Sequence, residues 1–333
     1  MNWVAIDIGS SEVKASVLDI RNTPVRLNYP MGGYYTTRLS TEVVITDSGE
    51  IVVGDNARLL GVMSPGLLFP DWQHHSCRES IYKALLSFVY NAAREHYADN
   101  VIGAVVLYES VQDECLVKVC EQIFAEIKPM KSSTVFAKST PGIKSGVTVV
   151  ADFGAQSFKV SILEDGEQKL FMHNPDLGFR ALDLDSLIDS VQWNNLTDVE
   201  SSLYGLLIQK AKVALNRGNH FILPYETKLK GDAINNEYER CMTTYLYQCF
   251  EECSNSLHVC FKTWEDVTNI LFVGGGANSN IIDSVFERYL QGKGYSLKSY
   301  NSTNKQFDTQ YAATNCAIQM PIISDNVITI KYR

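Results

Sequence analysis

The chain contains Asp7-Ile8-Gly9-Ser10-Ser11-Glu12-Val13-Lys14-Ala15-Ser16-Val17-Leu18 near its start, and it repeats this pattern as Asp152-Phe153-Gly154-Ala155-Gln156-Ser157-Phe158-Lys159-Val160-Ser161-Ile162-Leu163. At a constant offset of 145 residues the Asp, Gly, Lys, Ser and Leu of the two copies coincide, and apolar residues replace apolar ones. An internal repeat of this kind predicts two related half-domains that face one cleft.

Each copy places an aspartate two residues before a glycine, at a predicted turn between two strands. Backbone N–H groups at such a turn form a concave nest that suits phosphate oxygens, because no side chain stands between the ligand and the amides. Magnesium is usually held through one or two carboxylates together with phosphate oxygens. A single Asp-x-Gly turn is common without function, but two copies in register predict a site for Mg²⁺ and a nucleotide, with Asp7 and Asp152 as metal ligands.

A third glycine cluster follows an apolar strand in Ile270-Leu271-Phe272-Val273-Gly274-Gly275-Gly276-Ala277-Asn278, and a helical pattern comes after it. A glycine turn before a helix N-terminus favours an anion or a ribose, since free amides and the helix dipole both attract negative charge. The alternative is an ordinary strand-to-helix loop with small residues for close packing. The spacing Gly-x-Gly-x-x-Gly is absent, which argues against a dinucleotide-binding fold.

Length and composition agree with a soluble protein of two lobes. The chain has 333 residues, more than one core usually holds, and a formal net charge of −9 with scattered Lys and Arg, so bulk charge does not attract nucleic acid. The longest apolar stretch is too short to span a bilayer, and no signal-peptide core precedes Asp7. We therefore expect a cytoplasmic protein with no nucleic-acid and no membrane partner.

The eight cysteines include no Cys-x-x-Cys pair, and in a reducing compartment they are most simply small buried hydrophobes. Cys249 and Cys253 are one helical turn apart, but no histidine lies at matching spacing, so the pattern does not favour a metal site. His74 and His75 are more typical of a solvated loop than of a ligand set.

Strands and helices alternate in the predicted order of elements. We expect strands at 2–8, 12–20, 42–46, 51–54, 102–107, 134–137, 146–152, 157–163, 168–173 and from 270. We expect helices from Asp55 and at 78–97, 113–127, 180–191, 199–216, 235–254 and 307–320. Lobe I is predicted at 1–145, with 307–333 crossing back to it, and lobe II at 146–306.

These motifs resemble the actin, sugar-kinase and heat-shock-chaperone ATPase superfamily, most of all the nucleotide-binding domain of the seventy-kilodalton heat-shock chaperones. The resemblance rests on 41–57, 152–163, 209–215, 270–278 and 312–319. It implies a two-lobed actin-like ATPase fold, with duplicated ribonuclease H-like domains around a cleft that holds ATP or ADP with Mg²⁺.

The resemblance also implies a role for each matching residue. Asp7 and Asp152 would face the magnesium ion, and Lys212 would pack beside the adenine and ribose. Lys14 has the spacing of a lysine that reaches the phosphates in actins, and its alternative is an exposed strand lysine. The remaining implied contacts are to the terminal phosphates by Gly9, Ser10, Ser11 and Glu12, to the gamma position by Gly154, Ala155 and Gln156, and to the ribose and alpha-phosphate by Gly274, Gly275 and Gly276.

The chain departs from the chaperone pattern at three places. Ala155 and Gln156 stand where relatives have glycines, Ala137-Lys138-Ser139-Thr140 offers no acid where relatives have one, and no lysine lies between Ala57 and Arg78. Phosphoryl transfer depends on positioned charge and an oriented water, so we expect slow or absent hydrolysis. The chain ends soon after the crossing helix, so we expect no peptide-binding domain.

The predicted function is therefore a chaperone-like nucleotide-binding protein with a protein client or self-association. One alternative is a filament-forming actin-like protein, and another is a scaffold that keeps the fold without nucleotide. A small-molecule kinase is less favoured, because its base would have to be Asp176, Asp183 or Asp185, for which helix-cap roles are simpler.

Overall fold

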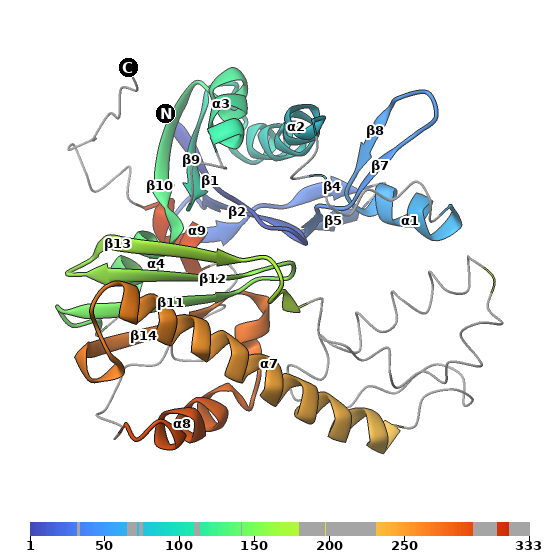
Figure 1. The fold of residues 1–333 in the computed structure, drawn as a ribbon. Coiled ribbons are helices and arrows are strands. Elements are labelled where there is room, and N and C mark those ends of the chain that lie inside the picture. Colours follow the sequence, from blue (N-terminus) through green and yellow to red (C-terminus); the bar gives the residue numbers. More distant parts are fainter. Residues whose placement is uncertain are drawn as a thin grey trace.

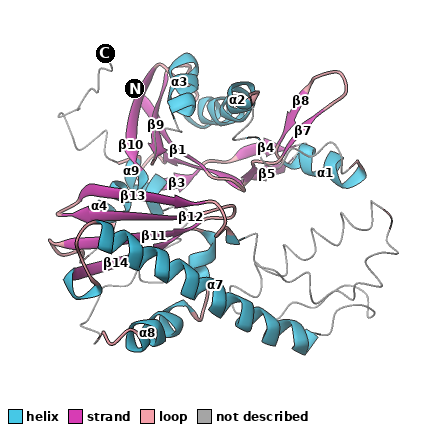
Figure 2. Cartoon of the chain, in the orientation of Figure 1, coloured by secondary structure: helices cyan, strands magenta, loops and turns pink. Residues whose placement is uncertain are grey.

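The structure, a computed structural model, describes residues 1–31, 34–64, 72, 76–109, 114–140, 142–179, 197, 231–295 and 312–319. It is a mixed α/β protein with two larger sheets, each combining parallel and antiparallel strands (Figures 1 and 2). Within the described residues, no helix combines the length and apolar character that crossing a membrane requires.

The first sheet has the strand order β10-β9-β1-β2-β3, and β6 also pairs with β2. β1 is antiparallel to β2, while β9 runs parallel to both β1 and β10. β9 is buried along almost its whole length, as a central strand covered on both faces should be. The strands are β1 (Asn2–Ile8), β2 (Glu12–Leu18), β3 (Pro24–Arg26), β6 (Leu39–Ser40), β9 (Ile102–Tyr108) and β10 (Glu126–Lys131).

The second sheet has the order β13-β12-β11-β14. β12 is antiparallel to β11 and β13, and β14 is parallel to β11. The strands are β11 (Val147–Phe153), β12 (Phe158–Glu164), β13 (Glu167–Asn174) and β14 (Val267–Val273). The repeated sequence is therefore also a repeat of strand order: β1–β2 and β11–β12 are both antiparallel pairs with a parallel strand beside the first member and an antiparallel strand beside the second.

Helices cover both faces of each sheet. α2 (Arg78–Tyr97) and α3 (Glu114–Ile123) bury apolar residues against one face of the first sheet, and α7 (Gly231–Val259) and α8 (Ile282–Gly292) do so on the second. α4 (Ser132–Ser139) and α9 (Ala312–Ala317) pack on the remaining face of the first sheet and contact each other (Figure 1). α4 contributes Val135 to the core beside the first sheet and Ala137 to the core beside the second, so it joins them.

The prediction of a strand at 134–137 is wrong, because these residues belong to α4. The strand that enters α4 is β10, in a segment that the sequence assigned partly to the helix at 113–127. β10 is an edge strand, which is where a proline such as Pro129 is tolerated. Ser and Thr at the start of α4 favour turns and caps in isolation, so their helical state depends on tertiary contacts.

Most other predicted elements are confirmed within a few residues. The smaller elements are β4 (Tyr29–Met31), β5 (Tyr34–Thr36), β7 (Val43–Ile45), β8 (Ile51–Val53) and α1 (Asp55–Met63), and two short 3-10 helices occur at Trp264–Asp266 and Gly275–Asn278. The sequence missed the short strands β3, β4, β5 and β6. The helices expected at 180–191 and 199–216, which include Lys212, lie outside the described residues.

Candidate functional site

The first hairpin pairs an acid with a lysine. Asp7 of β1 lies directly opposite Lys14 of β2, and Nζ of Lys14 donates to Oδ2 of Asp7 at 2.9 Å. Opposite residues in an antiparallel pair project from the same face of the sheet, which explains why the two side chains meet. The turn between them is closed by a 3.1 Å hydrogen bond from the amide of Gly9 to the carbonyl of Glu12.

The second hairpin has the same arrangement. Asp152 of β11 lies opposite Lys159 of β12, in the register that places Asp7 opposite Lys14. Burial raises the pKa of Asp152, and the positive charges of Lys159 and Lys14 oppose this shift. The repeat therefore supplies an acid and a lysine from each hairpin, and the sequence interpretation gave a role to only one of the two lysines.

Strand alternation directs both pairs toward the region between the sheets. In β1, Ala5 packs with α4 and α9 while Ile6 packs toward α2, so Asp7 projects on the face of Ala5. In β11, Val150 packs beside α4 while Ala151 packs with α7 and α8, so Asp152 projects on the face of Val150. The two aspartates thus leave their sheets on the faces that α4 joins.

Electrostatics show that the two hairpins share one cluster, made of Asp7, Lys14, Asp152 and Lys159 and called the Asp–Lys cluster below. Burial alone would lower the pKa of Lys14, but the carboxylates of Asp7 and Asp152 outweigh it and hold that pKa above its ordinary value. The negative charge of Asp7 in turn helps to raise the pKa of Asp152. The charge of Asp152 in the second hairpin therefore contributes to the raised pKa of Lys14 in the first.

The third glycine cluster lies against this site. Gly274 has a positive φ of 86°, and a Cβ at this position would lie 2.3 Å from Oδ1 of Asp152 and 2.7 Å from the carbonyl oxygen of Phe153. A Cβ on Gly276 would lie 2.9 Å from Cβ of Phe153. Side chains at these positions would push the end of β11 aside. A 3-10 helix at Gly275–Asn278, which includes the second and third glycines, lies between Gly274 and α8, so the N-terminus of α8 does not follow Gly274 directly.

The second turn is packed more tightly than a bare amide nest. The amide of Phe179 donates to the carbonyl of Gly154 at 3.0 Å, and a Cβ on Gly178 would lie 2.4 Å from the backbone carbon of Gln156. The segment 178–179 therefore lies directly on the turn that contains Ala155 and Gln156. All three turn residues, Gly154 to Gln156, remain partly exposed.

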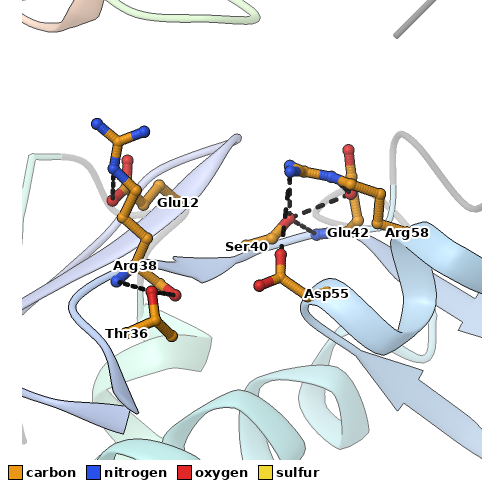
Figure 3. Close-up of polar contacts among 7 residues, drawn as sticks. All are labelled: Glu12, Thr36, Arg38, Ser40, Glu42, Asp55 and Arg58. Atoms are coloured by element: carbon orange, nitrogen blue, oxygen red, sulfur yellow. Dashed lines mark hydrogen bonds and ion pairs between the residues drawn. The ribbon is translucent and has the colours of Figure 1, made fainter. Parts of the chain in front are cut away.

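Two separate groups of polar contacts lie near the first turn, one at Glu12 and the other at Ser40 and Glu42 (Figure 3). Glu12 lies opposite Ser40 in the β2–β6 pair, and its carboxylate is 3.9 Å from the guanidinium of Arg38. Nε of Arg58 in α1 donates to Glu42 at 2.6 Å, and Glu42 in turn accepts from the hydroxyl of Ser40. Ser10 and Ser11 lie between Gly9 and Glu12 in the turn, and both are partly exposed.

A partly buried polar network beside the cluster was not predicted from the sequence. Glu109, which follows β9, accepts from the hydroxyl of Ser133 at 3.1 Å and from Nε2 of Gln168 at 2.9 Å, and it also accepts from the backbone amide of Ser133. Nε2 of Gln168 lies 3.1 Å from the hydroxyl of Ser161, and Lys131 bonds to Oε1 of Gln168. The network links the end of β9 and the start of α4 to β13 and β12.

Burial raises the pKa of Glu109 to about 7, although the hydrogen bonds from Ser133 and Gln168 and the charge of Lys159 oppose the shift. Lys159 therefore acts electrostatically on both Asp152 and Glu109. No local motif marks Glu109, because its partners come from distant segments. Lys159 was marked by the repeat, since it coincides with Lys14.

Two carboxylates suit a magnesium ion that takes its other ligands from phosphate oxygens and water. Asp7 and Asp152 fit that requirement, except that the ammonium group of Lys14 already occupies Oδ2 of Asp7. Across the described residues, no group of three or more His, Cys, Asp or Glu side chains could hold a metal by itself. An ion held by these two carboxylates would have further ligand positions open to phosphate oxygens and water.

The other cysteine and histidine expectations concern residues away from the cluster. Cys249 and Cys253 are buried free thiols in α7, and burial raises the pKa of both, which suits small core residues and not reactive ones. His74 and His75 lie outside the described residues.

The described site thus combines two acids, two lysines and three glycine turns. Lys14, Asp152 and Gly274 come from three separate parts of the chain. Such a set can bind an anion through ammonium groups and turn amides while its carboxylates hold a cation. Comparison of the sequence with models of protein families finds no matching family, and comparison with curated proteins finds no matching relative.

Proposed function

We propose that the protein is a chaperone-like nucleotide-binding protein that holds ATP or ADP with Mg²⁺ between two lobes, and that it hydrolyses ATP slowly or not at all. The proposed architecture is the two-lobed actin-like fold, with 1–145 and 307–333 in one lobe and 146–306 in the other. The matching strand orders around β1–β2 and β11–β12 support this duplication.

One observation carries the proposal: Asp7 and Asp152 leave their sheets on the faces that α4 joins, where the charges of both act to raise the pKa of Lys14. The two copies of the repeat therefore present their charged ends to one place, as a polyphosphate gripped from two sides requires. A structural duplication alone would not bring the two acids together. Gly274, in contact distance of Asp152, adds a third turn to the same place.

Each part of the site has a proposed role. Asp7 and Asp152 hold the metal ion, which neutralises phosphate charge when bound. The amides of 9–12 and 154–156 receive phosphate oxygens, and the turn at Gly274 to Gly276 lies under the ribose and the alpha-phosphate. The resemblance places Lys212 beside the adenine and ribose.

The polar groups at the start of α4 support the proposal of slow hydrolysis. Phosphoryl transfer needs a water held in line with the phosphate by a positioned group. α4 carries no acid in its first turn, and Glu109, the acid that reaches this helix, already accepts hydrogen bonds from Ser133 and Gln168. A carboxylate engaged in this way is poorly placed to orient a water.

Titration calorimetry with ATP and ADP, each with and without MgCl2, tests the proposal. Wild type is compared with Asp7→Asn and Asp152→Asn, and with Asp47→Asn as a control that removes an exposed carboxylate far from the cluster in sequence. We expect the magnesium-dependent part of the affinity to fall about tenfold or more in the first two variants, a loss of roughly 1.4 kcal/mol or more, and to persist in the control. Equal affinities in all four proteins would refute the site, and no binding by wild type would favour a nucleotide-free scaffold.

A further inference from the structure

Lys159 occupies the same place in the second hairpin as Lys14 does in the first. It lies opposite Asp152, and it alternates along β12 with Phe158 and Val160, which pack toward α7 and α8. Its side chain therefore projects on the other face, which it shares with Ser161 and Leu163. That face is the one that α4 joins to the first sheet.

The two lysines differ in their partners. The ammonium group of Lys14 is 2.9 Å from Oδ2 of Asp7. No hydrogen bond and no ion pair within 4.0 Å involves the ammonium group of Lys159 in the described parts of the chain. The charge of Lys159 nevertheless opposes the rise that burial causes in the pKa of both Asp152 and Glu109, so it acts on two acids without a hydrogen bond or ion pair to either.

A partly buried ammonium group that no carboxylate of the described residues holds is suited to a ligand anion, because a phosphate oxygen offers both charge and hydrogen-bond acceptors. Lys159 follows the turn at Gly154 to Gln156, where side chains at 155 and 156 reduce what a bare row of glycine amides would offer. The ammonium group of Lys159, near the start of β12, would supply attraction for phosphate oxygens in place of those glycine amides.

We propose that Lys159 binds the gamma-phosphate of ATP from the second hairpin, opposite Lys14 of the first. This inference rests on the proposed function, and it assigns to Lys159 the discrimination between ATP and ADP. The alternative is that Lys159 only offsets the negative charge of Asp152 and Glu109. A residue in that purely structural role would affect both nucleotides alike, since neither acid would distinguish them.

The test measures the affinities of ATP and ADP, each with MgCl2, for wild type and Lys159→Met. We expect the ATP affinity to fall about tenfold or more, the loss typical of one hydrogen bond to a charged group, and the ADP affinity to change less than about twofold. Lys159→Arg retains the charge and should retain the preference for ATP. Lys169→Met removes a lysine of β13 that is paired with Glu167 at the surface, and it should bind both nucleotides as wild type does.

A thermal unfolding transition of each variant establishes that it is folded, and Lys159→Gln is made beside Lys159→Met so that at least one neutral variant can be measured. If wild type binds ATP and ADP but the neutral variant loses both equally, or loses neither, the inference about Lys159 is overturned and the proposed function stands. If wild type binds neither nucleotide, both the proposed function and the inference about Lys159 are refuted.

Discussion

Gly274 lies so close to Asp152 that a methyl group on Gly274 would sit 2.3 Å from Oδ1 of the carboxylate. Asp152 of β11 pairs with Val273 at the end of the parallel strand β14, and Gly274 is the next residue along the chain. Gly274 also has φ at +86°, a conformation that residues with side chains rarely adopt. The glycine is therefore required twice, by its backbone conformation and by the acid beside it.

Gly274→Ala should destabilise the protein by about 2 to 4 kcal/mol, because strain from the positive φ adds to a clash with Oδ1 of Asp152 and the backbone of Phe153. Gly166→Ala is the matched control, since Gly166 has φ at +83° and open space where its Cβ would be. That control should cost only the conformational part, about 1 to 2 kcal/mol. Urea unfolding of both variants measures the difference, and equal losses would show that Asp152 does not constrain this turn.

The Lys14→Met variant should lose on the order of 1 to 3 kcal/mol of unfolding free energy, because it leaves the carboxylate of Asp7 uncompensated near Asp152. The pair is partly exposed, which keeps the loss below that of a fully buried pair. Lys83→Met, which breaks an exposed pair with Glu79 one helical turn away, should cost less than about 0.5 kcal/mol.

Added MgCl2 should also stabilise Lys14→Met more than wild type, because removal of the ammonium group frees Oδ2 of Asp7 for a cation. Thermal unfolding with and without the salt gives this comparison directly. Lys14→Met and Lys83→Met could instead give the same unfolding free energy and the same response to MgCl2. That result would mean that Asp7 and Asp152 do not form a common electrostatic site.

Glu109 should make stability fall as pH rises. Its pKa is about 7 in the folded protein against an ordinary value of 4.5, so the folded state holds the proton more tightly than the unfolded state does. Its contribution is therefore favourable at low pH and is lost between about pH 4.5 and pH 7, with a total on the order of 3 kcal/mol.

The measurement is the difference in unfolding free energy between Glu109→Gln and wild type at several pH values, since the other carboxylates contribute equally to both proteins. Gln at this position cannot ionise, so the unfolding free energy of Glu109→Gln should rise relative to that of wild type between about pH 4.5 and pH 7. Glu239→Gln, at an exposed position of α7, is the control for the removal of a carboxylate elsewhere in the protein. A flat difference for Glu109→Gln would mean that Glu109 titrates normally.

The amino-acid sequence alone determined the local parts of the site. The alternation of apolar residues on both sides of Gly9 and of Gly154 predicted both hairpins, and a short turn fixes the register that sets Lys14 opposite Asp7 and Lys159 opposite Asp152. These features depend on residues within a few positions of one another, where side-chain periodicity and turn geometry are sufficient.

Only the tertiary structure decided which of these parts meet. Lys14 and Asp152, Asp152 and Gly274, and Glu109 and Gln168 are each far apart along the chain, and their approach depends on how the two sheets pack across α4. Part of α4 was predicted as a strand, and its Ser and Thr residues have weak helix propensity. In the structure the start of α4 is held by a contact from a distant segment, because Ser133 donates its amide to Glu109. Contacts between distant segments offset the entropy lost in closing long loops only when they are buried in the assembled fold. No periodic pattern in the sequence indicates which distant residues will be buried together.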